Sequence, residues 1–219
     1  MFNNKARKKK RHAGTDIIST KQYNLVMGLC LLYGFVVNAI IAGTMGTFFS
    51  SIPVQPFVIG FFISGLIGTL IANISQKPII SFIGYNLILI PIGGVLSICL
   101  QEFEGADICA AMVVTGIVVI IMIAISTIKP AFFSKLGWPL FISLALGIIV
   151  EFGAMLLGYG GNWINWLYVG IFSLYIGYDW YKAQEYRKTV DNAIDSAIDL
   201  YLDIINLFLR ILSILSDDD

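Results

Sequence analysis

The chain has few charged residues, because Asp, Glu, Lys and Arg together make up only 13% of its 219 positions. Soluble domains usually carry about 25%. Hydrophobic residues account for 58% of the chain, so too little polar material is present to cover a water-facing surface. These shares exclude an ordinary soluble domain and predict a polytopic protein embedded in a lipid bilayer.

Residues that commonly build catalytic and metal sites are also scarce. The single histidine, His12, stands in a basic run, which argues against a histidine-built metal site or a Ser-His-Asp triad. Cys30, Cys99 and Cys109 lie in or beside apolar runs without a CxxC spacing, and we interpret them as small hydrophobic residues. No phosphate loop of the GxxxxGK[ST] type occurs. We therefore expect neither an enzyme nor a bound cofactor.

Long hydrophobic runs are what the chain has instead. A membrane-spanning helix needs roughly 20 mostly apolar residues. The chain is therefore predicted to be an all-α membrane protein with seven transmembrane helices (23–216), preceded by a basic tail (1–22) and followed by an acidic end (217–219). The runs lie near Leu25–Gly43, Phe57–Ile74, Ile79–Leu100, Ile108–Ile128, Leu136–Leu157, Trp163–Tyr181 and Ile194–Leu215.

Lysine and arginine predict the orientation of these helices. They occur in the N-terminal run KARKKKRH, at Lys21 and after the second, fourth and sixth runs, whereas the first, third and fifth loops contain none. Arg210, inside the last run, is the exception. Cytoplasmic segments carry an excess of basic residues, so the N-terminus is predicted to be cytoplasmic and the C-terminus to lie on the opposite side. We interpret the basic run as this orientation signal and expect no nucleic-acid partner.

Small residues form a repeated pattern on the second run. Gly60, Ser64, Gly68 and Ala72 recur every four residues, which predicts a groove where another helix approaches closely.

The last run, SAIDLYLDIINLFLRIL, contains polar side chains within an apolar segment. At roughly 100° per residue, they fall within about 80° of one another on a helical wheel. A charge at mid-membrane costs at least about 2.5–3.5 kcal/mol on insertion scales. The polar stripe should therefore face protein or water, which predicts a central last helix enclosed by the other six. The stripe consists of Asp195, Asp199, Asp203, Asn206 and Arg210.

Glu151 on the fifth run reaches the same depth as Arg210. A rise of 1.5 Å per residue places them roughly 22 Å and about 24 Å from the cytoplasmic side. We expect an ion pair in which each charge neutralises the other. It would act as a structural tie between helices or as an outer plug across a central path.

Asp179, in IGYDWY on the sixth run, and Asp203 form the predicted functional pair. Two carboxyl groups close together in a low dielectric tend to share one proton, which would make a pH-responsive latch between two helices. When both are ionised, their oxygens suit a hard cation such as Ca²⁺. The alternative is one protonated aspartic acid that bonds to backbone. Asp195, Asp199, Asn206 and Lys77 are possible accessory residues.

These segments resemble a known family. SAIDLYLDIINLFLRIL is similar to the final-helix signature of the Bax inhibitor family (transmembrane Bax inhibitor motif proteins), and IGYDWY resembles its sixth-helix motif. KPAFFSKLGWPLFISLALG resembles the entry into the family's fifth helix. The resemblance covers roughly the C-terminal half of the chain.

The resemblance implies a seven-helix fold and a pH-sensitive calcium leak gated by Asp179 and Asp203. Eukaryotic relatives are linked to suppression of cell death, and a chain this short looks more like the bacterial members, which implies a bacterial cytoplasmic membrane. Some members use an arginine on the second helix to engage the sixth-helix aspartate. Here Lys77 is the basic candidate at that helix, and Arg210 also departs from the family pattern.

Other functions remain open. A proton-coupled transporter would use Glu151, Asp179 and Asp203 as relay groups. An intramembrane aspartyl protease would match Tyr178–Asp179, but its second aspartate should follow Gly-x-Gly, whereas Asp203 follows LYL. Protein partners leave little trace in such a sequence, and none is predicted.

Overall fold

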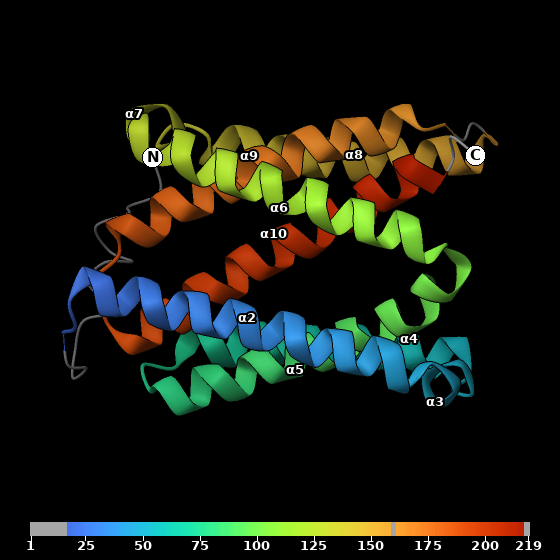
Figure 1. The fold of residues 1–219 in the computed structure, drawn as a ribbon, viewed down its shortest axis with the longest axis horizontal. Helices are drawn as coiled ribbons and strands as arrows, with labels where there is room; N and C mark the ends of the chain where they lie inside the picture. Colours follow the sequence, from blue (N-terminus) through green and yellow to red (C-terminus); the bar gives the residue numbers. More distant parts are fainter. Residues whose placement is uncertain (1–16, 159–160, 217–219) are drawn as a thin grey trace. The chain divides into compact units, whose positions relative to one another are not determined.

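A computed structural model describes residues 17–158 and 161–216, and within these ranges the chain is helical apart from short connections and contains no strand (Figure 1). The predicted basic run with His12 and the acidic end at 217–219 lie outside the described residues.

Each predicted apolar run coincides with one long helix. Two short helices, α3 (Gly46–Ser50) and α7 (Pro130–Phe133), and the 3-10 turn η1 (Leu100–Glu102) occur in segments that we expected to be loops. The long helices are α2 (Thr20–Thr44), α4 (Val54–Ile74), α5 (Pro78–Cys99), α6 (Gly105–Ile128), α8 (Gly137–Leu156), α9 (Trp163–Glu185) and α10 (Val190–Ser216).

Five of these segments are long and apolar enough to cross a membrane: α2, α4, α5 with η1, α6 and α8. This content of apolar helices identifies an integral membrane protein. Helices α9 and α10 have 23 and 27 residues but are not among the five found in the described part of the chain. Helix α10 contains four aspartates and one arginine, and charges of this kind lower the mean hydropathy of a segment. The count of seven spans therefore stays a prediction.

Local sequence explains where several helices begin and end. Ser19 and Gln22 form a capping box at the start of α2, with N–H to side-chain oxygen distances of 3.2 and 3.0 Å. Thr189 starts α10 in a related way, because its Oγ1 accepts the N–H of Asn192 at 3.2 Å. Helix α8 ends before Gly158, whose φ of +71° suits a residue without a side chain.

The chain divides into two compact units. Unit 1 comprises residues 1–102 and 185–198, and unit 2 comprises residues 103–184 and 199–219. Helices α2 to α5 and the first part of α10 therefore belong to unit 1. Helices α6 to α8, nearly all of α9 and the remainder of α10 belong to unit 2.

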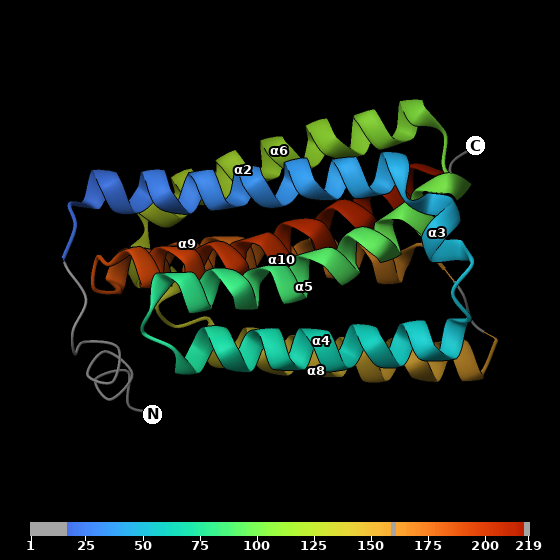
Figure 2. The same ribbon diagram turned by 90° about the horizontal axis from the view of Figure 1, so that it is seen from below.

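In unit 1, α5 lies between α2 and α4 (Figure 2). The predicted groove of small residues on α4 packs on α5. A methyl group at Gly68 would lie 2.6 Å from the carbonyl oxygen of Gly84, so the two backbones touch directly. One turn earlier, Ser64 Oγ donates a hydrogen bond to the Leu87 carbonyl oxygen at 2.5 Å. Gly60, the first member of the pattern, meets no atom within 4 Å.

Candidate functional site

The position of Asp179 on α9 is fixed by its neighbours in unit 2. Gly177 lies two residues before it, and a methyl group there would collide with the ring of Phe133 on α7. On the α6 side, Ser126 Oγ donates a hydrogen bond to the Gly177 carbonyl oxygen at 2.6 Å. Close packing and a buried hydrogen bond therefore hold this turn of α9 in place.

The side chains of Asp179 and Asp203 lie next to each other. Asp179 on α9 is 9% exposed, Asp203 on α10 is 8% exposed, and the two carboxyl groups are close enough to act on each other electrostatically. An ionised carboxylate has no hydrogen to donate, so this contact is a hydrogen bond only when one of the two carries a proton. Asp203 Oδ2 is buried and accepts no N–H or O–H donor from the described residues. The geometry thus allows a shared proton, and the sharing itself stays a prediction.

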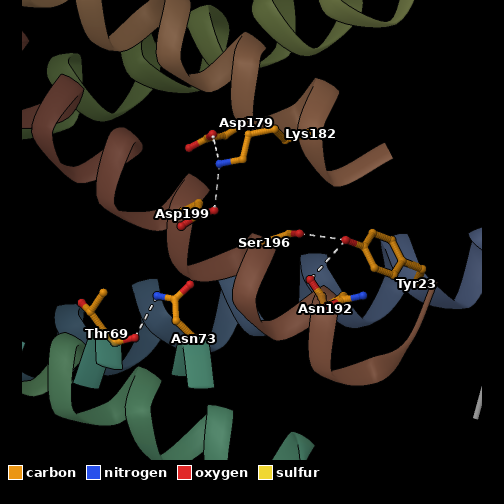
Figure 3. A network of polar contacts seen from close by, with 8 residues as sticks. All are labelled: Tyr23, Thr69, Asn73, Asp179, Lys182, Asn192, Ser196 and Asp199. Atoms are coloured by element: carbon orange, nitrogen blue, oxygen red, sulfur yellow. Dashed lines mark hydrogen bonds and ion pairs between the residues drawn. The ribbon is translucent and has the colours of Figure 1, made fainter. Parts of the chain in front are cut away.

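A cation that we did not anticipate contacts Asp179, one member of this pair. Helix α9 continues to Glu185, so Lys182 stands in its last turn rather than in a loop. Its Nζ lies 2.8 Å from Asp179 Oδ1 and 3.3 Å from Asp199 Oδ2 on α10 (Figure 3). The three-residue spacing of Asp179 and Lys182 was the available signal, but only if both are helical. Lys77, our basic candidate, is an exposed residue at the start of α5 in unit 1.

The structure brings Glu151 and Arg210 together in unit 2. Arg210 Nη1 and Nη2 donate to Glu151 Oε1 and Oε2 at 2.7 and 3.1 Å. Nη1 also donates to Asn165 Oδ1 at 3.0 Å, and the guanidinium carbon lies 4.1 Å from the centroid of the Tyr168 ring. The Asn165 amide in turn donates to Ser213 Oγ at 3.0 Å. This second polar group therefore connects α8, α9 and α10.

The remaining residues of the predicted stripe differ in their surroundings. Asp195, in the unit 1 part of α10, is 5% exposed, whereas the side chain of Asp199 is 44% exposed. Asn206 is exposed, and its Nδ2 donates to the carbonyl oxygen of Leu202 at 2.8 Å. An amide satisfied by its own helix does not require enclosure by protein. The stripe is thus not uniformly buried, and whether its exposed members face water stays a prediction.

The start of α10 forms a further buried polar cluster in unit 1, which we did not anticipate. Tyr23 Oη of α2 lies 2.7 Å from Ser196 Oγ and donates to the Asn192 carbonyl oxygen at 3.1 Å (Figure 3). Ser81 Oγ of α5 donates to Asp191 Oδ1 at 2.7 Å. These partners are separated by 110 to 173 positions, so no local pattern connects them. They fasten the beginning of α10 to two helices of unit 1.

The described residues contain no group of three or more His, Cys, Asp and Glu side chains arranged to hold a metal ion. A resident metal with an all-protein ligand set is therefore not indicated in this part of the chain. The carboxyl pair offers too few ligands for a permanent Ca²⁺ site, which usually has six to eight oxygens.

Comparison with known proteins gives a match over nearly the whole chain. The family model described as "Inhibitor of apoptosis-promoting Bax1" matches residues 16–219. It extends the likeness well beyond the C-terminal half, where the recognisable motifs lie. A search of curated proteins found no significant match to the chain.

Proposed function

Because this chain belongs to the Bax inhibitor family, we propose that it conducts calcium ions passively across a membrane and that Asp179 and Asp203 gate this leak in response to pH. The observation that carries the proposal is the burial of two carboxyl groups on different helices, close enough to act on each other. Such a pair is stable with one proton and repulsive without it.

The gating step follows from this charge balance. With one proton shared, the carboxyl pair carries a single negative charge and joins α9 to α10. When the proton leaves, two negative charges face each other in a site where water screens them poorly. We propose that the resulting repulsion separates the two helices and exposes carboxylate oxygens to a divalent cation.

The proposed architecture has seven membrane spans, with α10 enclosed by the other six. Most apolar side chains of α10 are buried, including those of Leu207 and Leu212, which are both fully buried. Burial of this kind supports an internal helix rather than one that faces lipid. The basic residues support a cytoplasmic N-terminus and a C-terminus on the opposite side. A bacterial cytoplasmic membrane is the proposed location.

The surroundings of Asp203 favour a leak over proteolysis. Leu200 and Tyr201 precede Asp203 on α10 and are 1% and 0% exposed. A peptide substrate would have to displace these packed side chains to reach the carboxyl group. We therefore propose that the chain is not an enzyme.

A proton-coupled transporter is the second candidate function. Such a protein would need a chain of carboxyl groups that exchange protons. Glu151 is engaged by Arg210 through two hydrogen bonds, which stabilises its ionised form and makes it a poor relay group. This contact favours the leak.

The test uses purified protein in liposomes that contain a calcium indicator, with flux measured at a series of pH values. We expect flux above that of protein-free liposomes, with an increase as the pH rises and the shared proton leaves. A leak continues when a protonophore abolishes the proton gradient, whereas coupled transport stops. Absence of flux at every pH would contradict the proposal.

A further inference from the structure

The side chain of Lys182 links two carboxylates that belong to different helices of unit 2. Its Nζ lies 2.8 Å from Asp179 Oδ1 on its own helix and 3.3 Å from Asp199 Oδ2 on α10. Figure 3 shows the ammonium group between the two acids. The side chains of Lys182 and Asp179 are 20% and 10% exposed, whereas that of Asp199 is 44% exposed. Lys182 thus connects a buried carboxylate with one that water reaches.

An ammonium group and a divalent cation seek the same partners. Both bind carboxylate oxygens, and the ammonium is a compact, mobile point charge on a flexible stem. At 2.8 Å from Oδ1, Lys182 occupies the space in which a cation would contact that oxygen. The two cannot bind this oxygen in the same place at the same time.

We propose that Lys182 is a tethered competitor of the permeating cation, a positioning residue whose ammonium group must move away from Asp179 before a divalent cation can bind there. This inference rests on the proposed function, since it specifies how the same carboxyl pair is regulated. Lys182 also holds α9 to α10 through Asp199. Its release therefore loosens the contact between these helices at the moment when the ion binds.

The charges around Lys182 give the direction of its effect. The charged groups of unit 2 that act on Asp179 are Lys182 itself, Asp199 and Asp203. Two tyrosines of α9 are also near: Tyr175 interacts with both Asp179 and Asp203, and the Tyr178 ring lies 5.4 Å from the Lys182 ammonium. With one proton shared by Asp179 and Asp203, these groups carry two negative charges and one positive charge. Without the lysine, no positive charge opposes the carboxylates, so they hold the shared proton more firmly.

The test compares three substitutions that separate charge from hydrogen bonding. Lys182→Gln keeps donors without the charge, Lys182→Met removes both, and Lys182→Arg keeps the charge. Lys135→Gln is the matched control, because Lys135 is an exposed lysine of the same unit. Each protein is assayed for the pH midpoint of calcium flux in liposomes. The melting temperature of each protein in detergent is also measured at increasing calcium concentrations, at a pH above its flux midpoint.

We expect Lys182→Gln and Lys182→Met to move the flux midpoint upward by about one pH unit or more, because an opposite charge at this distance has effects of that size. Calcium should also stabilise these two variants at a concentration at least about tenfold lower than the parent protein requires, since a competing unit charge is gone. Lys182→Arg and Lys135→Gln should stay close to the parent protein in both assays.

Two results would overturn the inference while leaving the proposed function in place. One is a conducting Lys182→Gln protein with an unchanged midpoint and unchanged calcium sensitivity. The other is a Lys182→Arg protein that shifts as far as Lys182→Gln, because charge would then not be the cause. A parent protein with neither flux nor calcium-dependent stabilisation would remove the proposed function and this inference together.

Discussion

Arg210 on α10 holds Glu151 on α8 through two hydrogen bonds, from Nη1 to Oε1 at 2.7 Å and from Nη2 to Oε2 at 3.1 Å. This fork-to-fork arrangement is the strongest form of an arginine–carboxylate contact. The face of the Tyr168 ring lies 4.1 Å from the guanidinium carbon, which adds a cation–π contact. Three helices of unit 2 are therefore joined at one charged centre.

Breaking this ion pair from one side should destabilise the protein. Glu151→Gln leaves the guanidinium of Arg210 without its counter-charge, and we expect a lower melting temperature in detergent. The loss should be smaller than the roughly 3–5 kcal/mol of a fully buried pair, because the Glu151 side chain is 39% exposed. The double change with Arg210→Met should recover part of the loss, with a coupling energy of about 0.5–3 kcal/mol. If the two effects simply add, the ion pair does not stabilise the fold.

Because α4 packs on α5, two glycines of α4 should differ in how well they tolerate a larger side chain. Gly68→Ala would place a methyl group 2.6 Å from the backbone oxygen of Gly84, and a backbone atom cannot rotate away. Gly65→Ala is the matched control, since a methyl group there meets nothing within 4 Å. Both changes gain similar helix propensity, so their difference isolates the packing cost. We expect Gly68→Ala to be less stable than Gly65→Ala by about 1–3 kcal/mol, as measured by thermal unfolding. Equal melting temperatures would show that the helices separate easily.

Hydropathy predicted the long helices well, because an apolar run of sufficient length has few alternatives to a helix in a membrane. It predicted the end of α9 poorly. Hydropathy falls at Tyr181, whereas the helix continues to Glu185 because backbone hydrogen bonds persist into polar sequence. For this reason the ion pair between Lys182 and Asp179 was not predicted, because a three-residue spacing brings the two side chains together only within a helix.

Contacts between side chains could be predicted only where the sequence indicates how deep each residue lies in the membrane. Glu151 and Arg210 could be paired, since both are charged and both lie at similar depth in long helices. Tyr23 and Ser196 could not be paired, because a tyrosine near a helix start has many possible partners and 173 positions separate the two. Their contact depends on how α2 packs against α10 within unit 1, which hydropathy does not specify.

Gly177 should be more sensitive to substitution than another glycine of the same helix. A methyl group at Gly177 would collide with the buried ring of Phe133, whereas one at Gly170 meets nothing within 4 Å. We expect Gly177→Ala to lower the melting temperature and Gly170→Ala to leave it unchanged or slightly higher. Because Asp179 lies two residues beyond Gly177, the first variant should also alter the pH profile of calcium flux. A Gly177→Ala protein that matches Gly170→Ala in both measurements would contradict this account of how Asp179 is positioned.

The last prediction concerns the carboxyl pair itself. Asp179→Asn and Asp203→Asn keep the size of the side chain but remove its titration. With either change, no proton is shared, and calcium flux in liposomes should lose most of its dependence on pH. The flux can rest at a high or a low level, because an amide still donates a hydrogen bond to the remaining carboxylate. Asp199→Asn is the comparison: its half-exposed side chain is not part of the pair, so the shape of the pH profile should persist with only a small shift. If both Asp179→Asn and Asp203→Asn retain the parent profile, a shared proton does not gate the leak, however close the two carboxyl groups lie.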